Sequence, residues 1–294
     1  MKKILIIGSS GFIGSNISEY LKKSSCYDIY APSSTDLDAT NEIDVKRFLE
    51  NKYYDVIIHC AVDNSSIKKY KNDKNQMRNT LQMFYNFEKY KHMFGKMLYF
   101  GSGAEYDKSK DIIDVCENDF GRSIPDDDYG FAKYIISKQI EKTDNIYNLR
   151  LFGVFGENEY WKTKFISNIC CKSLKNIPLT IRQNVYFDYL WINDLCKIVD
   201  WFINNTPKYR VYNVTTGKKI DLLTIANIVN SLRCEKLPIF VCKEGLANEY
   251  TSNNSRLLNE IKDMEFTPIE ESIKQLLLYY KNNIDKIDIY SLSY

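Results

Sequence analysis

The stretch DDDYGFAK, residues 126–133, places a phenol and an amine four residues apart. If this segment is helical, Tyr129 and Lys133 are close to one turn apart, so both side chains lie on the same face. A phenol beside an ammonium can transfer a proton, because the positive charge favours tyrosinate and lowers a pKa that is about 10 in water. In a chain with 23 tyrosines, the spacing alone does not distinguish this chemistry from a surface pair.

A second candidate for chemistry is the turn IIGSSGFIGSN, near the start of the chain. Gly8, Gly11 and Gly14 have the spacing G-x-x-G-x-x-G, directly after an apolar run and directly before a helical pattern. Such a turn lets the backbone approach a pyrophosphate closely, and the start of the helix offers free N–H groups and the positive end of its dipole. We therefore predict a dinucleotide site here, to which Phe12 and Ile13 contribute.

The end of the second apolar run, in IYAPSSTD, indicates which dinucleotide is bound. A carboxylate at this position would bind the ribose 2′-hydroxyl of NAD. Pro32, Ser33 and Ser34 stand there instead, and hydroxyls leave room for a 2′-phosphate, although no arginine is near to bind one. The sequence favours NADPH and leaves NAD possible.

Cysteines, histidines and charge exclude several classes of protein. The eight cysteines form no C-x-x-C, and His59 and His92 are the only histidines, so no zinc-type metal site is expected. The net charge of +2, with acidic and basic residues interspersed, argues against nucleic acid as a partner. Without a secretory segment or an apolar run near 18 residues, we expect a reduced, soluble, cytoplasmic protein that does not bind membranes.

Short apolar runs alternate with amphipathic segments along the first half of the chain. Runs of this kind are typical of strands buried on both faces of a parallel sheet, and their alternation with helices indicates a doubly wound α/β fold with right-handed crossovers. We predict a Rossmann-type domain over 1–157, a smaller C-terminal α/β substrate-binding lobe over 158–294, and a return of roughly 187–213 to the first domain. The expected strands are 3–8, 27–31, 55–61, 96–102 and 147–156, and the expected helices are 13–23, 43–51, 75–94 and 129–143.

With the glycine turn, DVIIHCAV, YFGSGAEY and YGFAK in this order, the chain resembles the extended short-chain dehydrogenase/reductase family. Within that family it is most similar to the nucleotide-sugar epimerases, dehydratases and 4-ketoreductases, including the GDP-L-fucose synthase-like reductases. The stretches NLRLFGVFG, FDYLWINDLCKIV and VYNVTTGKKIDLLTIA extend the resemblance over nearly the whole chain. The family uses a Ser/Thr–Tyr–Lys set, which the resemblance places on Ser102, Tyr129 and Lys133.

The resemblance also implies a role for each of these side chains. Tyr129 would donate its proton to the oxygen of a sugar ketone while the nicotinamide delivers a hydride. Ser102 would hold the carbonyl oxygen, and Lys133 would also bind the nicotinamide ribose, so Tyr129 and Lys133 contact the cofactor as well. Further cofactor contacts are implied for Ser33, Ser34, Asp38, Ala39, Ala61, Asn79 and Phe152, and substrate contacts for Ser102, Gly103 and Arg182.

The residues after Ser102 separate the reactions of the family. Its dehydratases carry Asp-Glu directly after the catalytic Thr, where this chain has Gly103 and Ala104, and Glu105 comes one position late. The fucose-synthase branch uses a Cys two residues after the Ser and a His further along, but Ala104 takes that Cys position and no histidine follows His92. Because proton abstraction beside a ketone needs a positioned base, the expected reaction is simple reduction at C4 of a 4-keto-6-deoxy sugar.

Two other functions remain open at this stage. An NAD-dependent nucleotide-sugar 4-epimerase needs only the Ser, Tyr and Lys, although the missing acid after the second run and the small tail argue against it. The other is a non-catalytic dinucleotide-binding sensor. A sensor would not need Ser102, Tyr129 and Lys133 together, so the complete set argues against this function. The expected partner is a nucleotide sugar from surface-polysaccharide biosynthesis, capsular or lipopolysaccharide, and a homodimer through helices such as 75–94 and 129–143 is possible. The nucleotide, the sugar length and the C4 stereochemistry stay open.

Overall fold

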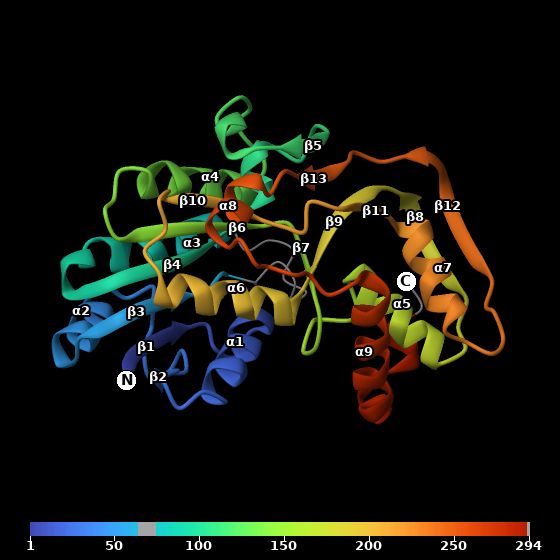
Figure 1. The fold of residues 1–294 in the computed structure, drawn as a ribbon, viewed down its shortest axis with the longest axis horizontal. Helices are drawn as coiled ribbons and strands as arrows, with labels where there is room; N and C mark the ends of the chain where they lie inside the picture. Colours follow the sequence, from blue (N-terminus) through green and yellow to red (C-terminus); the bar gives the residue numbers. More distant parts are fainter. Residues whose placement is uncertain (64–74, 293–294) are drawn as a thin grey trace.

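The central sheet of the protein has six strands, all of which run parallel. The computed structural model describes residues 1–63 and 75–292 (Figure 1). The six strands are β1 (Lys2–Ile7), β2 (Tyr27–Tyr30), β3 (Tyr54–His59), β4 (Phe94–Ser102), β6 (Ile146–Leu151) and β10 (Val211–Val214). Their order is β10-β6-β4-β3-β1-β2. From β1 the chain adds β2 on one side and the later strands on the other, so the strand order reverses at β1. A crevice that binds ligands forms at such a point, beyond the carboxyl ends of the strands.

Helices cover both faces of this sheet (Figure 1). In β1, Ile4 and Ile6 point to one face and Leu5 and Ile7 to the other, and all four are buried. This burial on both sides explains why the strand is apolar throughout. The predicted Rossmann-type doubly wound fold is confirmed. One face carries α1 (Phe12–Lys22) and α6 (Ile192–Asn204), and the other carries α2 (Glu42–Asn51), α3 (Gln76–Glu88) and α4 (Asp128–Ile140).

The single strand expected over 147–156 is instead two strands in different sheets. β6 ends at Leu151, and β7 (Gly153–Phe155) pairs with β9 (Tyr186–Trp191). Gly153 permits this change of partner, because a Cβ there would lie 2.7 Å from the Asp188 carbonyl oxygen. The chain thus leaves the central sheet at Phe152, next to the carboxyl end of β4.

The remaining elements form two smaller sheets and several helices, most of which lie together at one end of the molecule (Figure 1). The second sheet brings together strands that are far apart in sequence. Their order is β11 (Lys219–Asp221), β9, β13 (Tyr250–Ser252) and β5 (Ile112–Val115), and β7 pairs with β9. No helix within 1–63 and 75–292 has both the length and the apolar composition needed to cross a bilayer. The elements are β5 (Ile112–Val115), α5 (Phe165–Leu174), β8 (Leu179–Asn184), β11 (Lys219–Asp221), α7 (Leu222–Ser231), β12 (Ile239–Leu246), β13 (Tyr250–Ser252), α8 (Ser255–Glu260) and α9 (Ile269–Asn282), with short 3₁₀ turns at Lys91–Met93, Gly103–Tyr106, Glu117–Asp119, Ile284–Lys286 and Ile289–Leu292.

Candidate active site

Ser102 is the last residue of β4 and the N-cap of the 3₁₀ turn that follows it. Its Oγ accepts a hydrogen bond from the N–H of Ala104 at 3.1 Å, and its own N–H donates to the Glu105 carboxylate at 3.0 Å. These two bonds form a capping box, which satisfies the free N–H groups at the start of the turn. The serine is therefore fixed at the carboxyl edge of the sheet.

Tyr129 and Lys133 come to the same edge from α4. The Asp127 carboxylate accepts a hydrogen bond from the N–H of Gly130 at 2.9 Å, so the helix begins just before the tyrosine. One turn then separates the two side chains, and both line a cavity of about 190 Å³ together with Ser102. The Tyr129 hydroxyl also shares a hydrogen bond with the Ser102 hydroxyl. The structure thus brings the three expected catalytic residues together.

Lys133 is almost fully buried, and two hydrogen bonds hold its ammonium. Nζ donates to the Tyr99 hydroxyl and to the Phe100 carbonyl oxygen, each at 2.7 Å, and lies 6.0 Å from the centre of the Tyr129 ring. Burial lowers the pKa of Lys133 to about 8. An ammonium has three donors, so one remains for a ligand in the cavity.

The pKa of Tyr129 is raised, and the largest cause is burial. The hydrogen bond from Ser102 acts in the opposite direction and only partly offsets it. The expectation that Lys133 lowers this pKa is wrong for this structure, because Tyr99 and Phe100 hold the ammonium and burial penalises the phenolate. Tyr129 therefore keeps its proton, which is the form that can donate one.

A second cavity, of about 620 Å³, follows the glycine turn and lies next to the first, with Cys60 and Val62 lining both. Gly8 has a φ of +80°, and a Cβ there would lie 2.7 Å from the backbone nitrogen of Ala61. A Cβ on Gly14 would collide with the Gly8 carbonyl oxygen. This close-fitting backbone suits a dinucleotide. Of the predicted cofactor residues, this cavity is lined by Gly8, Gly11, Ser33, Ser34, Asp38, Ala39 and Ala61.

The other predicted binding residues lie in three different places. Phe12, Ile13 and Phe152 line the smaller cavity, the one that Ser102, Tyr129 and Lys133 also line and that we call the catalytic cavity. Asn79 lines neither cavity, but its amide donates a hydrogen bond at 2.7 Å to the carboxylate of Asp63, which lines the larger one. Gly103 lies behind the catalytic cavity, where a Cβ would come 2.5 Å from the hydroxyl of Tyr250 and 2.6 Å from the Phe152 ring.

Arg182, expected to bind the substrate, is not brought to the site. It lies on β8 with an exposed side chain and lines neither of these two cavities.

Four residues near the catalytic cavity were missed by the sequence analysis. The Tyr250 hydroxyl interacts with Ser102, and Lys108 Nζ lies 5.8 Å from the Tyr129 ring and 5.6 Å from the Tyr250 ring. Glu159 and Lys164 line the cavity itself. No local motif marks these residues, because separate elements of the C-terminal half and the turn after β4 bring them to the site.

Asp36 is a further missed residue, at the adenosine end. Its carboxylate accepts hydrogen bonds from the N–H of Ser33 at 3.1 Å and from the Ser33 hydroxyl at 2.6 Å. These bonds lower the pKa of Asp36, so it is ionised at neutral pH. A negative charge therefore stands next to the serine pair that was expected to accept a 2′-phosphate.

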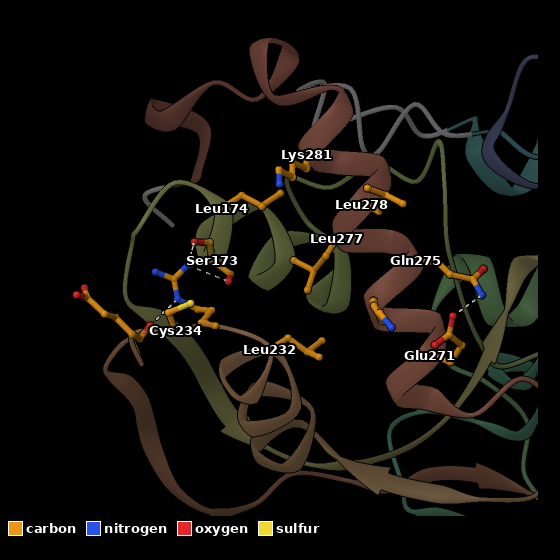
Figure 2. A pocket seen from close by; sticks show the side chains of 12 residues that line it. Ser173, Leu174, Leu232, Cys234, Glu271, Gln275, Leu277, Leu278 and Lys281 are labelled. Atoms are coloured by element: carbon orange, nitrogen blue, oxygen red, sulfur yellow. Dashed lines mark hydrogen bonds between the residues drawn. The ribbon is translucent and has the colours of Figure 1, made fainter.

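A larger cavity, of about 750 Å³, lies away from this site between α5, α7 and α9 (Figure 2). Leucines from α5, from α9 and from the end of α7 at Leu232 line much of it, and none of the predicted site residues is among its lining residues. The expected catalytic residues thus lie away from this larger cavity. Within the described ranges, no group of three His, Cys, Asp or Glu side chains could hold a metal ion. The residues on the large cavity that Figure 2 labels are Ser173, Leu174, Leu232, Cys234, Glu271, Gln275, Leu277, Leu278 and Lys281.

Comparisons with known proteins find relatives and solved structures that are similar to this chain over nearly its whole length. The GDP-6-deoxy-D-talose 4-dehydrogenase of Aggregatibacter actinomycetemcomitans is 23% identical over 305 residues, which cover 98% of this chain and 100% of that protein. The GDP-L-fucose synthetase of Naegleria fowleri bound to NADP has a similar fold, with a TM-score of 0.80 and 15% identity over 97% of this chain and 95% of that one. The GDP-mannoheptose C4 reductase of Campylobacter jejuni with NADP bound gives a TM-score of 0.78 and 17% identity over 95% and 98% of the two chains.

The family assignment rests on a match that covers more than half of the chain. Residues 4–215 match the model of the NAD dependent epimerase/dehydratase family, a range that runs from the first strand to the end of β10. It includes the glycine turn, Ser102, Tyr129 and Lys133. The predicted resemblance is thereby confirmed: the chain belongs to the NAD dependent epimerase/dehydratase family of extended short-chain dehydrogenases/reductases.

Proposed function

We propose that the protein uses NADPH to reduce the C4 ketone of a nucleotide-linked 4-keto-6-deoxy sugar. The observation that carries this proposal is that Ser102, Tyr129 and Lys133 line one cavity, next to a glycine-walled cavity that suits a dinucleotide. The names of two similar proteins, a GDP-6-deoxy-D-talose 4-dehydrogenase and a GDP-mannoheptose C4 reductase, support chemistry at C4 of a nucleotide sugar.

The residues of the chain would divide the work around the ketone. When bound, the nicotinamide supplies the hydride. Tyr129 donates its proton to the ketone oxygen, and the Ser102 hydroxyl holds that oxygen by a hydrogen bond. Lys133 would use its third donor on the nicotinamide ribose. The glycine turn and the start of α1 would hold the diphosphate of the cofactor.

Two observations favour reduction over the other reactions of the family. Tyr129 keeps its proton, which suits donation to a ketone. Dehydration needs an acid and a base after Ser102, but Gly103 and Ala104 stand there. Glu105 is fully buried and paired with Arg150, so it is not available to a substrate.

The C-terminal half would hold the nucleotide sugar. We propose that residues 158–294 serve mainly as this substrate-binding lobe, whereas α6 and β10 pack on the central sheet and belong to the dinucleotide-binding domain. Lys108 and Lys164 bring positive charge to the catalytic cavity, where Arg182 does not reach, and positive charge suits the diphosphate of a nucleotide sugar.

A turnover experiment tests this proposal. The purified protein is mixed with a GDP-linked 4-keto-6-deoxyhexose and NADPH, the loss of NADPH absorbance is followed, and the product is identified by NMR. We expect stoichiometric NADPH oxidation and a C4 alcohol. If instead the protein interconverts C4 epimers of a nucleotide sugar without net use of cofactor, it is an epimerase. If it binds cofactor but turns over no nucleotide sugar, the sensor reading gains.

A further inference from the structure

Glu159 is a buried carboxyl group in the wall of the catalytic cavity, and the proposed reaction gives it no role. It follows β7 and is 6% exposed. Its Oε2 accepts a hydrogen bond from the hydroxyl of Ser167 on α5 at 2.5 Å. Oε1 accepts no hydrogen bond from any described residue, and it is not fully buried. Glu159 is one of the residues that line the catalytic cavity.

The groups around Glu159 leave its charge largely uncompensated. Lys164, just before α5, is the cation that acts on it, and its own side chain is exposed. Lys133 and Tyr129 line the same cavity. The other titratable neighbours are Cys170 on α5, Tyr189 on β9 and Tyr280 on α9; burial raises the pKa of each, so all three are neutral near pH 7.

The nicotinamide end of the cofactor is the part that reaches this cavity. The glycine turn and Ser33, Ser34 and Asp38 line the larger cavity, which suits the diphosphate and adenosine. Cys60 and Val62 line both cavities, so the opposite end of a bound cofactor would lie beside Tyr129. That end has two features that suit a carboxylate, namely the N–H₂ donor of the carboxamide and the positive charge of the oxidised ring.

We propose that Glu159 binds the nicotinamide end of the cofactor, with Oε1 accepting a hydrogen bond from the carboxamide. Its negative charge then stabilises the oxidised, positively charged ring more than the reduced, neutral one. This makes the reduced cofactor a stronger hydride donor in the site, because the product of hydride transfer is the form that the carboxylate favours. The inference rests on the cofactor named in the proposed function and not on the identity of the sugar.

The test compares dissociation constants of the oxidised and reduced forms of one cofactor across pH, by titration calorimetry. Burial raises the pKa of Glu159 to about 7, so the carboxylate forms between about pH 6 and pH 8. Binding of the oxidised form should strengthen over this interval, and the ratio of the two constants should change by about tenfold, equivalent to one pKa unit of coupling. Titration of the 2′-phosphate of NADP affects both forms and cancels in the ratio.

Three variants make the result specific. Glu159→Gln keeps an acceptor oxygen without the charge, so the change of the ratio between pH 6 and pH 7 should be lost, while the part due to Lys133, whose pKa is about 8, remains at higher pH. Ser167→Ala removes the donor to Oε2, so the midpoint of the pH dependence should move upward. Glu157→Gln, in the same segment but not in the cavity wall, should behave as the wild type.

Clear results would overturn the inference. A ratio that does not change with pH in the wild type, or a Glu159→Gln variant with the wild-type ratio and pH dependence, excludes it. If the wild type binds no nicotinamide cofactor, the inference and the proposed function fail together. If it binds cofactor with the expected pH dependence but reduces no nucleotide sugar, the inference stands and only the proposed function fails.

Discussion

Glu105 connects the backbone of Ser102 to the guanidinium of Arg150 in the interior of the protein. One carboxylate oxygen accepts the Ser102 N–H at 3.0 Å, and the other accepts Arg150 Nε at 2.5 Å. Both charged side chains are fully buried. Arg150 donates further hydrogen bonds to the hydroxyls of Tyr106 at 2.9 Å and Ser137 at 2.7 Å. The position of Ser102 is thus tied to a buried ion pair.

Replacing Glu105 by Gln should destabilise the protein strongly. The variant leaves Arg150 buried without its counter-charge, and breaking a buried pair in this way costs about 3–5 kcal/mol. Urea unfolding of the two proteins measures the difference in the free energy of unfolding. Glu50→Gln, which removes a largely exposed partner of Lys46, should cost at most about 1 kcal/mol. Equal losses in the two variants would show that the buried pair has no special role in stability.

Local patterns in the sequence predicted the parts of the site that depend on local structure. The glycine turn and the Tyr129–Lys133 spacing each lie within one strand–turn–helix unit, where backbone geometry fixes the side chains. Tyr250 and Glu159 could not be found in this way, because pairing of β13 with β9 and the departure of β7 from the central sheet bring them in. That departure was itself missed, since an apolar run does not show which sheet it joins.

Tyr129→Phe should abolish most of the proposed reduction without loss of stability. The variant loses the proton donor but keeps the ring, so kcat should fall by about 10²–10⁴-fold. Binding of the cofactor, measured by calorimetry, should change little. Tyr134→Phe, in the same helix but outside the cavity wall, is the matched control. If Tyr129→Phe retained wild-type turnover, another group would have to supply the proton.

Tyr250→Phe should have a smaller effect than Tyr129→Phe. Its hydroxyl interacts with Ser102, so removal frees that serine without removing a proton donor. One such hydrogen bond contributes about 0.5–1.5 kcal/mol, which corresponds to a fall in kcat of roughly threefold to tenfold. Steady-state kinetics with the nucleotide sugar gives kcat for each of the two variants under the same conditions. A loss as large as that of Tyr129→Phe would contradict this ranking and would mean that the Tyr250 hydroxyl takes part in the proton transfer as well.

The stability of the wild type relative to Lys133→Met should rise with pH. Burial lowers the pKa of Lys133 to about 8 from 10.5, so between these values the unfolded chain binds a proton that the folded protein does not. Unfolding is then disfavoured as pH increases, and the relative gain is lost as pH falls through 8. Between pH 7.5 and pH 9.5 the difference in the free energy of unfolding should grow by about 2 kcal/mol. A constant or falling difference in urea unfolding would mean that Lys133 is not desolvated.

Asp36→Asn should increase the affinity for NADPH relative to NADH. Because Ser33 holds this carboxylate beside the expected position of the 2′-phosphate, the two negative charges repel each other, and only NADPH carries the phosphate.

Calorimetric titration of both cofactors should show NADPH binding several-fold tighter in the variant, NADH binding unchanged, and a smaller difference at high salt, which screens exposed charges. Glu50→Gln on α2 removes an equal charge away from this cavity and should leave both affinities as they are. If Asp36→Asn instead weakened NADH and left NADPH unchanged, the carboxylate would be binding the ribose hydroxyl. It would then be the acid that the sequence analysis did not find at the end of the second strand, and NAD would be the preferred cofactor.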